Sequence, residues 1–178
     1  SGLLALSEYL DVCEITGKSA LNAKLSTCSI TGRKGLTLLM AWCEHSNQPI
    51  FPDQAVKCQA TGKVIAHKYS GHSAFSGWLV DVSLLQKSEK PPYREGIESE
   101  FQKCALTGKR LLKDEIAISD WSKLPVDKAL LMISRVSLRY ATREEMVQCQ
   151  ETFQHLLPDE VLRCSVTGRV VDKRLLIK

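Results

Sequence analysis

The sequence predicts a mainly β fold, a tandem array of short β-hairpins that repeats roughly every fifteen residues and carries one inserted helix, so α+β overall. The motif Cys-x-x-Thr-Gly-Lys/Arg occurs five times, beginning at Cys13, Cys28, Cys58, Cys104 and Cys164. The seven cysteines are separated by four gaps of fifteen residues and by two longer gaps of forty-six and forty-five. A fixed period is typical of stacked units, and one this short favours strand–turn units over pairs of helices.

Each complete motif predicts a hairpin. In the last one, short apolar-bearing runs at 161–164 and 169–171 flank the turn residues Ser165-Val-Thr-Gly168. Gly168 can supply the positive φ that a short hairpin loop requires, and the Thr167 hydroxyl can bond back to the turn backbone. Between hairpins, Phe51-Pro-Asp-Gln54 and Leu157-Pro-Asp-Glu160 place Pro and acidic residues as in the first turn of a helix. They predict one short helical turn each.

Two units keep the cysteine but lose the Thr-Gly pair. Asn47 follows Cys43 at the glycine position, and Phe153 follows Cys149 there. Asn tolerates the left-handed conformation better than Phe does. The sequence therefore predicts the same turn at Asn47 and a different turn at Phe153.

The two long gaps between cysteines do not match the motif. In the first, Leu79–Leu84 alternates as a half-buried strand does, before a polar, Pro-containing loop. In the second, a helix within 120–145 is predicted by Pro125 and by the spacing of Val126, Ala129, Leu130, Ile133, Val136 and Tyr140. The predicted organisation is N-terminal repeats 1–66, an insertion 67–103, a central repeat 104–118, a helical insertion 119–145 and C-terminal repeats 146–178, within one continuous domain.

Composition sets further expectations. A chain of 178 residues that is 44% hydrophobic can bury a core, and its net charge of +4 is too small by itself to indicate a polyanionic partner. No apolar run approaches the roughly 20 residues of a membrane span, and the first residues lack the pattern of a signal peptide. Regularly spaced cysteines in odd number are expected to be reduced and buried. We therefore expect a cytoplasmic protein with no membrane partner.

The motif is similar to a zinc knuckle, Cys-x-x-Cys-Gly-Lys, in which Thr has replaced the second thiolate. Each unit then supplies one thiolate, and stacked units cannot bring four to one ion at bonding distance. We expect no metal and no other cofactor, and the same unfolding temperature with and without a strong chelator. The alternative is a mixed site that uses Cys43, His45, Cys58 and either His67 or His72.

Catalytic motifs are weak. Gly17-Lys18-Ser19 matches the end of a phosphate-binding loop, but Val12 stands where that loop needs its first Gly. Cys43 with His45, or Cys149 with His155, could pair a thiol with a base, yet the periodicity of the cysteines favours a structural role. We expect no catalytic residues and no enzymatic activity.

The residue after each Gly is basic, and it defines what we call the basic position. Its members in the complete motifs are Lys18, Arg33, Lys63, Lys109 and Arg169. An ordered stack would set them in rows able to follow a phosphate backbone, with binding that weakens as salt rises. The alternative is that they are solvated strand ends.

A protein partner is the second hypothesis. Trp78 and Trp121 lie in the two predicted insertions, and aromatic residues often anchor protein interfaces. Packing in the core is the competing explanation for both.

The consensus Cys-x-x-Thr-Gly-Lys-x-Leu-x-Pro-Asp-Glu-Leu resembles degenerate zinc-knuckle-like repeats in the C-terminal regions of large bacterial helicase-like ATPases. That resemblance covers about half of the chain, at its two ends and around Cys104. It implies an accessory module for nucleic-acid or protein contacts within a larger protein, with no catalytic residues of its own.

Overall fold

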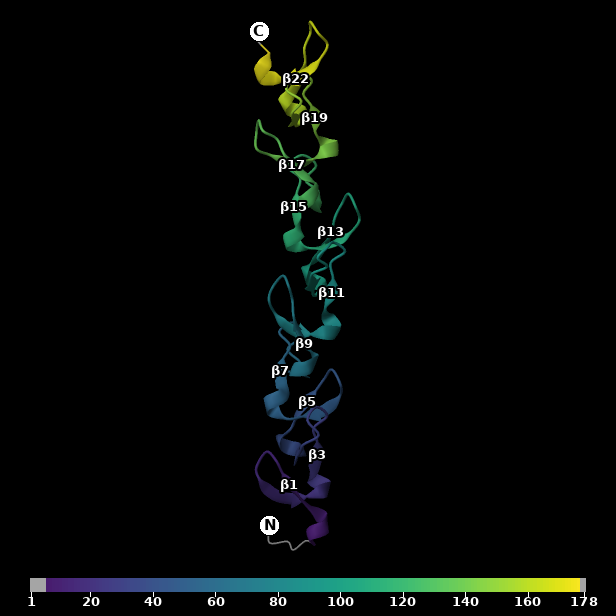
Figure 1. The fold of residues 1–178 in the computed structure, drawn as a ribbon, viewed down its shortest axis with the longest axis vertical. Helices are drawn as coiled ribbons and strands as arrows, with labels where there is room; N and C mark the ends of the chain where they lie inside the picture. The colour runs from purple at the N-terminus through teal and green to yellow at the C-terminus, as the bar shows by residue number, and fades with distance from the viewer. Residues whose placement is uncertain (1–5, 177–178) are drawn as a thin grey trace. The chain divides into compact units, whose positions relative to one another are not determined.

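The structure is a computed structural model that describes residues 6–176. Its contacts divide the chain into a first unit, of residues up to 86 with 95–98, and a second unit, of residues 87–94 and from 99 onward. Each unit repeats one element, a two-stranded antiparallel hairpin followed by a single turn of 3-10 helix (Figure 1). The predicted array of β-hairpins is confirmed.

The described residues of the first unit form five hairpins. They are β1–β2 (Leu10–Cys13, Lys18–Leu21), β3–β4 (Leu25–Thr27, Lys34–Leu36), β5–β6 (Ala41–Cys43, Gln48–Ile50), β7–β8 (Ala55–Lys57, Val64–Ala66) and β9–β10 (Ser70–His72, Leu79–Asp81). Its 3-10 turns are η1 (Ser7–Tyr9), η2 (Asn22–Lys24), η3 (Thr37–Leu39), η4 (Pro52–Gln54), η5 (His67–Tyr69) and η6 (Val82–Leu84). The chain passes to the second unit through β11 (Gln86–Lys87), β12 (Glu95–Gly96) and η7 (Glu98–Glu100).

The second unit contains five further hairpins. They are β13–β14 (Phe101–Lys103, Arg110–Leu112), β15–β16 (Ile116–Ile118, Pro125–Asp127), β17–β18 (Leu131–Ile133, Tyr140–Thr142), β19–β20 (Val147–Gln148, His155–Leu156) and β21–β22 (Val161–Arg163, Val170–Asp172). Its turns are η8 (Lys113–Glu115), η9 (Lys128–Leu130), η10 (Arg143–Glu145), η11 (Pro158–Glu160) and η12 (Lys173–Leu175). The helical turns predicted at 51–54 and 157–160 are confirmed as η4 and η11.

The first and last motifs form the same turn. The N–H of Gly17 donates to the carbonyl of Cys13 at 2.7 Å, and the N–H of Gly168 donates to that of Cys164 at 2.8 Å. Both glycines have positive φ, 68° and 71°. Gly reaches this conformation without a steric penalty, which explains its place in the motif.

The prediction of a different turn at Phe153 is wrong. Phe153 has φ of 58°, and its N–H donates to the carbonyl of Cys149 at 2.8 Å, as Gly does in the complete motifs. Asn47 takes the same conformation, as predicted, and so does Leu138. A non-Gly residue loses about 1–2 kcal/mol in this region. Phe153 is 71% exposed, so crowding by other residues does not increase this cost.

The prediction of a helix within 120–145 is also wrong, because this segment contains strand β16, the hairpin β17–β18 and the single 3-10 turns η9 and η10. Apolar residues that share a buried helix face should be buried together. Val126 is buried here, whereas Ile133 and Tyr140 are about half exposed. The apolar residues that are spaced as in a helix therefore belong to two hairpins and do not share one buried face. In segment 67–103, only Leu79–Asp81 of the predicted strand is a strand, and η6 follows it.

Both presumed insertions are in fact further copies of the repeat. The residue that opens each turn, which we call the anchor residue, is Ser instead of Cys in these copies. The anchor residues are Cys13, Cys28, Cys43, Cys58, Ser73, Ser88, Cys104, Ser119, Ser134, Cys149 and Cys164. The turn at Ser88 is one residue longer, because its N–H pairs with Arg94, six positions on, instead of five. That extra residue explains the gap of forty-six.

The core combines the anchor residues with residues at the end of the second strand in most hairpins. Ile65 and Ala66 are buried in the first unit, and Leu111 and Leu112 are buried in the second. The largest buried cluster of the first unit joins Cys28, Cys43 and Cys58 with such residues. Burial of one apolar layer per repeat replaces the single large core of a globular domain.

Consecutive repeats are linked at what we call a joint. The residue after the anchor donates its N–H to a carbonyl of the next hairpin, as Glu14 does to Lys34 and Gln150 does to Val170, both at 2.9 Å. The side chain of Gln150 also accepts the N–H of Val170 at 2.9 Å. The joint thus satisfies main-chain groups that a two-stranded sheet leaves unpaired.

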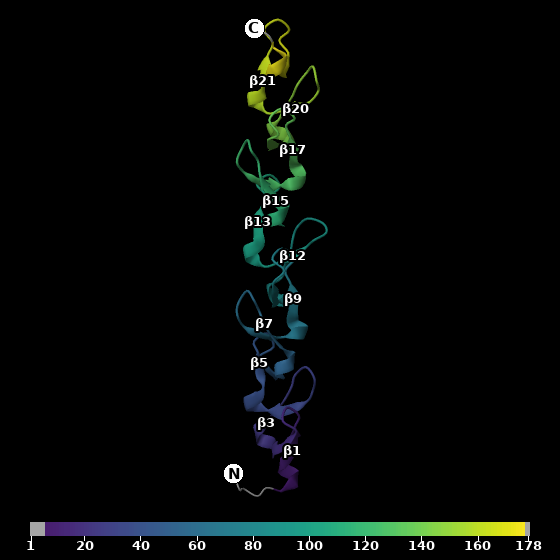
Figure 2. The same cartoon turned by 90° about the vertical axis from the view of Figure 1, so that its left-hand side faces the viewer.

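Successive turns point in different directions within a unit. In the first unit, the loops of β1–β2 and β5–β6 extend to opposite sides in Figure 1, and those of β3–β4 and β7–β8 do so in Figure 2. Side chains carried on consecutive turns are therefore not aligned along one edge. Among residues 6–176, no helix has the length and apolar character required to cross a membrane.

Candidate functional site

The cysteine anchors serve the joints. The Sγ of Cys13 accepts the N–H of Leu36 at 3.3 Å, that of Cys43 accepts Ala66 at 3.2 Å, and that of Cys104 accepts Asp127 at 3.4 Å. In each case the donor lies twenty-three residues later, in the next repeat. These sulfur atoms are thus buried and accept a backbone N–H from the following repeat.

The Thr of the motif bonds across the turn. Its hydroxyl oxygen accepts the N–H at the basic position, at 3.4 Å from Thr16 to Lys18 and at 3.3 Å from Thr107 to Lys109. A hydrogen bond from the Thr16 hydroxyl, supported by backbone N–H groups, lowers the pKa of Cys13 to about 7. At Cys149, burial raises the pKa, but the Thr152 hydroxyl and nearby N–H groups outweigh it and lower the value to about 7. The Thr hydroxyl and the turn N–H groups therefore favour the thiolate form of these two cysteines.

Removal of this hydroxyl should raise the pKa of Cys149. We expect Thr152→Val to move it upward and Thr152→Ser, which keeps the hydroxyl, to leave it near 7. Because the folded pKa is depressed, the thiolate stabilises the fold at high pH, and that gain is lost as pH falls through about 7. The Cβ chemical shift of Cys149 followed against pH measures the change. An unaltered titration in Thr152→Val would contradict the assigned cause.

The serine anchors form a different joint. The Ser134 hydroxyl donates to Glu160 at 2.5 Å, and the same carboxylate accepts the N–H of Leu157 at 2.8 Å. Ser119 and Ser88 bond in the same way to Glu145 and Glu115, at 2.6 Å each. Burial raises the pKa of Glu160, but these hydrogen bonds hold it below its ordinary value. A carboxylate thus takes the N–H that the cysteine sulfur accepts elsewhere.

The alternative metal site is not assembled. His45 points its Nδ1 at the Asp81 carboxylate, at 2.8 and 2.9 Å, and stacks on Tyr69 with ring centroids 4.2 Å apart. His72 faces the carbonyl of Gly77 instead. Within residues 6–176, no three His, Cys, Asp or Glu side chains come together as metal ligands.

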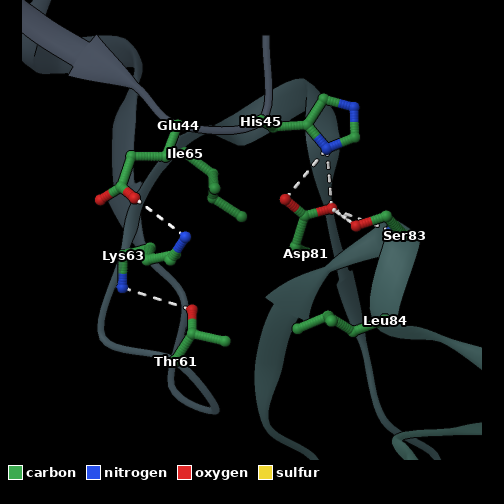
Figure 3. A pocket seen from close by; sticks show the side chains of 8 residues that line it. All are labelled: Glu44, His45, Thr61, Lys63, Ile65, Asp81, Ser83 and Leu84. Atoms are coloured by element: carbon green, nitrogen blue, oxygen red, sulfur yellow. Dashed lines mark hydrogen bonds and ion pairs between the residues drawn. The ribbon is translucent and has the colours of Figure 1, made fainter. Parts of the chain in front are cut away.

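A pocket of about 340 Å³ surrounds the His45–Asp81 pair (Figure 3). Lys63 and Glu44 form an ion pair at 3.2 Å on one side of it. Asp81 also accepts the N–H and the hydroxyl of Ser83, at 2.9 and 2.7 Å. In the second unit, Lys90 bonds to Asp127 at 2.6 Å from the equivalent place in its repeat. In both cases the residue two positions after an anchor contacts an Asp at the end of the second strand of a later hairpin, so the His45–Asp81 contact recurs in the array.

Three members of the basic position are held in ion pairs between repeats. Arg33 bonds to Glu14 at 3.0 Å, Lys63 to Glu44 at 3.2 Å and Arg169 to Glu151 at 2.7 Å. Lys18 and Lys109 form no ion pair with other described residues. Exposed pairs of this kind contribute about 0–1 kcal/mol. They do, however, offset the positive charge that a phosphate backbone would meet.

The two tryptophans predicted as interaction residues are outside the core. Trp78 is 45% exposed and Trp121 is 41% exposed, which excludes core packing for both. They occupy different places in the repeat, because Trp78 stands at the basic position and Trp121 lies two residues after an anchor.

The sequence reasoning missed a set of exposed apolar side chains on the hairpins β15–β18. Ile118 and Tyr140 are about half exposed, at 53% and 50%, and Ile133 and Leu138 are exposed as well. Ile133 and Tyr140 are cross-strand neighbours. Alignment of the serine-anchored repeats with the cysteine-anchored ones would have placed Ile118 and Ile133 at a position that is polar in most other copies. No family model, no curated protein and no solved structure matches the chain, so the resemblance to zinc-knuckle-like repeats stays a prediction.

Proposed function

We propose that this chain is a non-enzymatic protein-interaction module whose partner binds the exposed apolar side chains of β15–β18. One observation carries the proposal. Ile118 and Ile133 directly precede the anchors of two consecutive repeats and are 53% and 43% exposed. The same position holds a polar residue in seven of the other nine repeats, namely Thr27, Lys57, His72, Lys87, Lys103, Gln148 and Arg163. It is also apolar at Val12 and Trp42, but Ile118 and Ile133 are the one case in which two consecutive repeats carry an apolar residue there.

Folding of the array does not require an exposed position to be apolar in some repeats when it is polar in most others. Each repeat has its own buried layer, and Ile118 and Ile133 add little to it. Contiguous exposed apolar side chains mark interaction surfaces more often than they serve folding. Trp121, in the turn between β15 and β16, adds an aromatic residue of the kind that anchors interfaces. The joints then act as a scaffold that fixes these side chains.

Site-specific photo-crosslinking tests the proposal. A photoreactive phenylalanine analogue at Tyr140 should give protein adducts in an extract of the source cells, and Ile118→Ser with Ile133→Ser should remove them. The matched control carries the probe at Val12, which is 50% exposed at the equivalent of Ile118 in the first unit. The same adducts from both probe positions, or adducts that survive the double substitution, would refute the proposal.

Nucleic acid is the second candidate, favoured by the charge of the second unit. That unit contains 17 Lys and Arg against 12 Asp and Glu, whereas the first unit contains 7 against 8. Lys109, at the basic position, lies in this unit. Nuclease-sensitive adducts in the crosslinking experiment, lost as salt rises, would favour this candidate over a protein partner.

A further inference from the structure

The hairpins β15–β18 also form a pocket, of about 330 Å³. Its lining consists of Ala117, Ile118, Leu131 and Tyr140, with Lys128. The apolar residues come from β15, β17 and β18, and Lys128 begins the turn η9. This volume lies at the lower end of the range of ligand-binding pockets, about 300–1,000 Å³. The pocket therefore has room for one apolar side chain of a ligand.

The pocket is formed before any partner binds, because a joint holds its walls together. The N–H of Asp120 donates to the carbonyl of Tyr140 at 2.6 Å, and the N–H of Tyr140 donates to the Asp120 carboxylate at 2.7 Å. This pair of bonds fixes β18 against the preceding turn. A preformed site loses less conformational entropy on binding than a flexible one.

The charge around the pocket selects the ligand. Lys128 is exposed and forms no ion pair with the other described residues. The unit that carries it has an excess of Lys and Arg over Asp and Glu. Charge complementarity therefore favours a partner with carboxylates beside its apolar side chain. A peptide in which Asp or Glu stands beside an apolar residue has both of these features.

We propose that this pocket binds a peptide segment of the partner that presents one apolar side chain flanked by Asp or Glu. The apolar side chain lies between Ile118, Leu131 and Tyr140, and a neighbouring carboxylate pairs with Lys128. The inference rests on the proposed function and names the chemistry of the partner. A nucleobase could stack on Tyr140, but the aliphatic walls at Ile118 and Leu131 offer it no hydrogen-bond partners from their side chains.

Selection from a random linear peptide library displayed on phage, with the full chain as bait, tests the inference. Enriched sequences should contain Leu, Ile or Phe next to Asp or Glu. Binding of a synthetic enriched peptide should weaken about tenfold or more with Ile118→Ser or Tyr140→Ser. Lys128→Glu should weaken acidic peptides and favour basic ones, while Val12→Ser should change neither. Circular dichroism shows whether each variant keeps the fold.

The outcomes separate the inference from the proposed function. Enriched peptides without acidic residues, or peptides insensitive to Lys128→Glu, would overturn the inference but leave an apolar interaction surface. No enrichment would overturn the inference as well. Peptides whose binding is unaffected by Ile118→Ser and Tyr140→Ser would contradict both. Competition by a single-stranded oligonucleotide, lost at high salt, would assign the pocket to nucleic acid instead.

Discussion

Replacing Glu160 with Leu is expected to lower the free energy of unfolding by about 2–5 kcal/mol. Glu160 is buried, and its carboxylate accepts the Ser134 hydroxyl and the N–H of Leu157. Loss of the carboxylate leaves both donors buried without a partner, and each unsatisfied group costs about 1–3 kcal/mol. Urea denaturation followed by circular dichroism measures the change.

The second substitution Ser134→Cys should restore most of that loss. Most cysteine-anchored repeats have an apolar or aromatic residue at the place of Glu160, such as Leu130, which lies twenty-six residues after Cys104. The Cys104 sulfur accepts the N–H of Asp127 directly. Ser134→Cys with Glu160→Leu therefore converts one kind of joint into the other. Glu144→Leu, at an exposed site, is the control and should change stability by less than about 0.5 kcal/mol. A double variant no more stable than Glu160→Leu would contradict the equivalence of the two joints.

The two joints should also differ in acid. The folded pKa of Glu160 lies below its ordinary value of 4.5. Its contribution to stability is therefore present above pH 4.5 and is lost as pH falls through the folded pKa. The double variant lacks this carboxylate, so acid should destabilise it less than the unmodified chain. The difference isolates one joint from the other carboxylates of the array.

The hairpins were predictable where the motif is complete. Gly17 and Gly168 signal a left-handed turn, and the threonines signal a hydrogen bond across it, so the local sequence determines the local conformation. The repeats anchored by Ser119 and Ser134 were not recognised, because Ser cannot replace Cys at a joint by itself. Replacement of Cys by Ser requires a Glu twenty-six residues after the Ser. A search for the motif within single repeats does not relate that Glu to the Ser anchor. The retained Ser-x-x-Ser spacing, at Ser119 and Ser122, was the available signal.

The candidate site was predictable only in part. Trp121, predicted as an interaction residue, lies in the segment that carries the proposed site, because an aromatic residue outside the motif is visible in the sequence alone. Ile118 and Tyr140 were not, since the helix predicted for 120–145 assigned Tyr140 to a buried face. Whether a residue in so short a strand faces the core depends on its distance from the anchor. That distance could be counted only after Ser119 and Ser134 were known to be anchors.

Phe51→Ala is expected to lower the free energy of unfolding by about 3–5 kcal/mol, the usual cost of truncating a buried Phe. Phe51 is 3% exposed, and the guanidinium of Arg33 lies 4.3 Å from its ring centroid. A Cβ added at Gly35 would lie 3.3 Å from the Phe51 ring and 2.8 Å from Ile15. Gly35 therefore leaves the space that Phe51 and Ile15 fill.

The next repeat carries the reverse combination, with Ile50 in place of Gly35 and Ala66 in place of Phe51, and both are buried in the same cluster. Gly35→Ile alone should cost about 1–3 kcal/mol from overpacking, although Ile matches the neighbouring copy. Together with Phe51→Ala it recreates the Ile50–Ala66 combination. The double variant should therefore be at least about 1 kcal/mol more stable than the sum of the single effects indicates. Purely additive losses in urea denaturation would show that the two positions do not share one packing site.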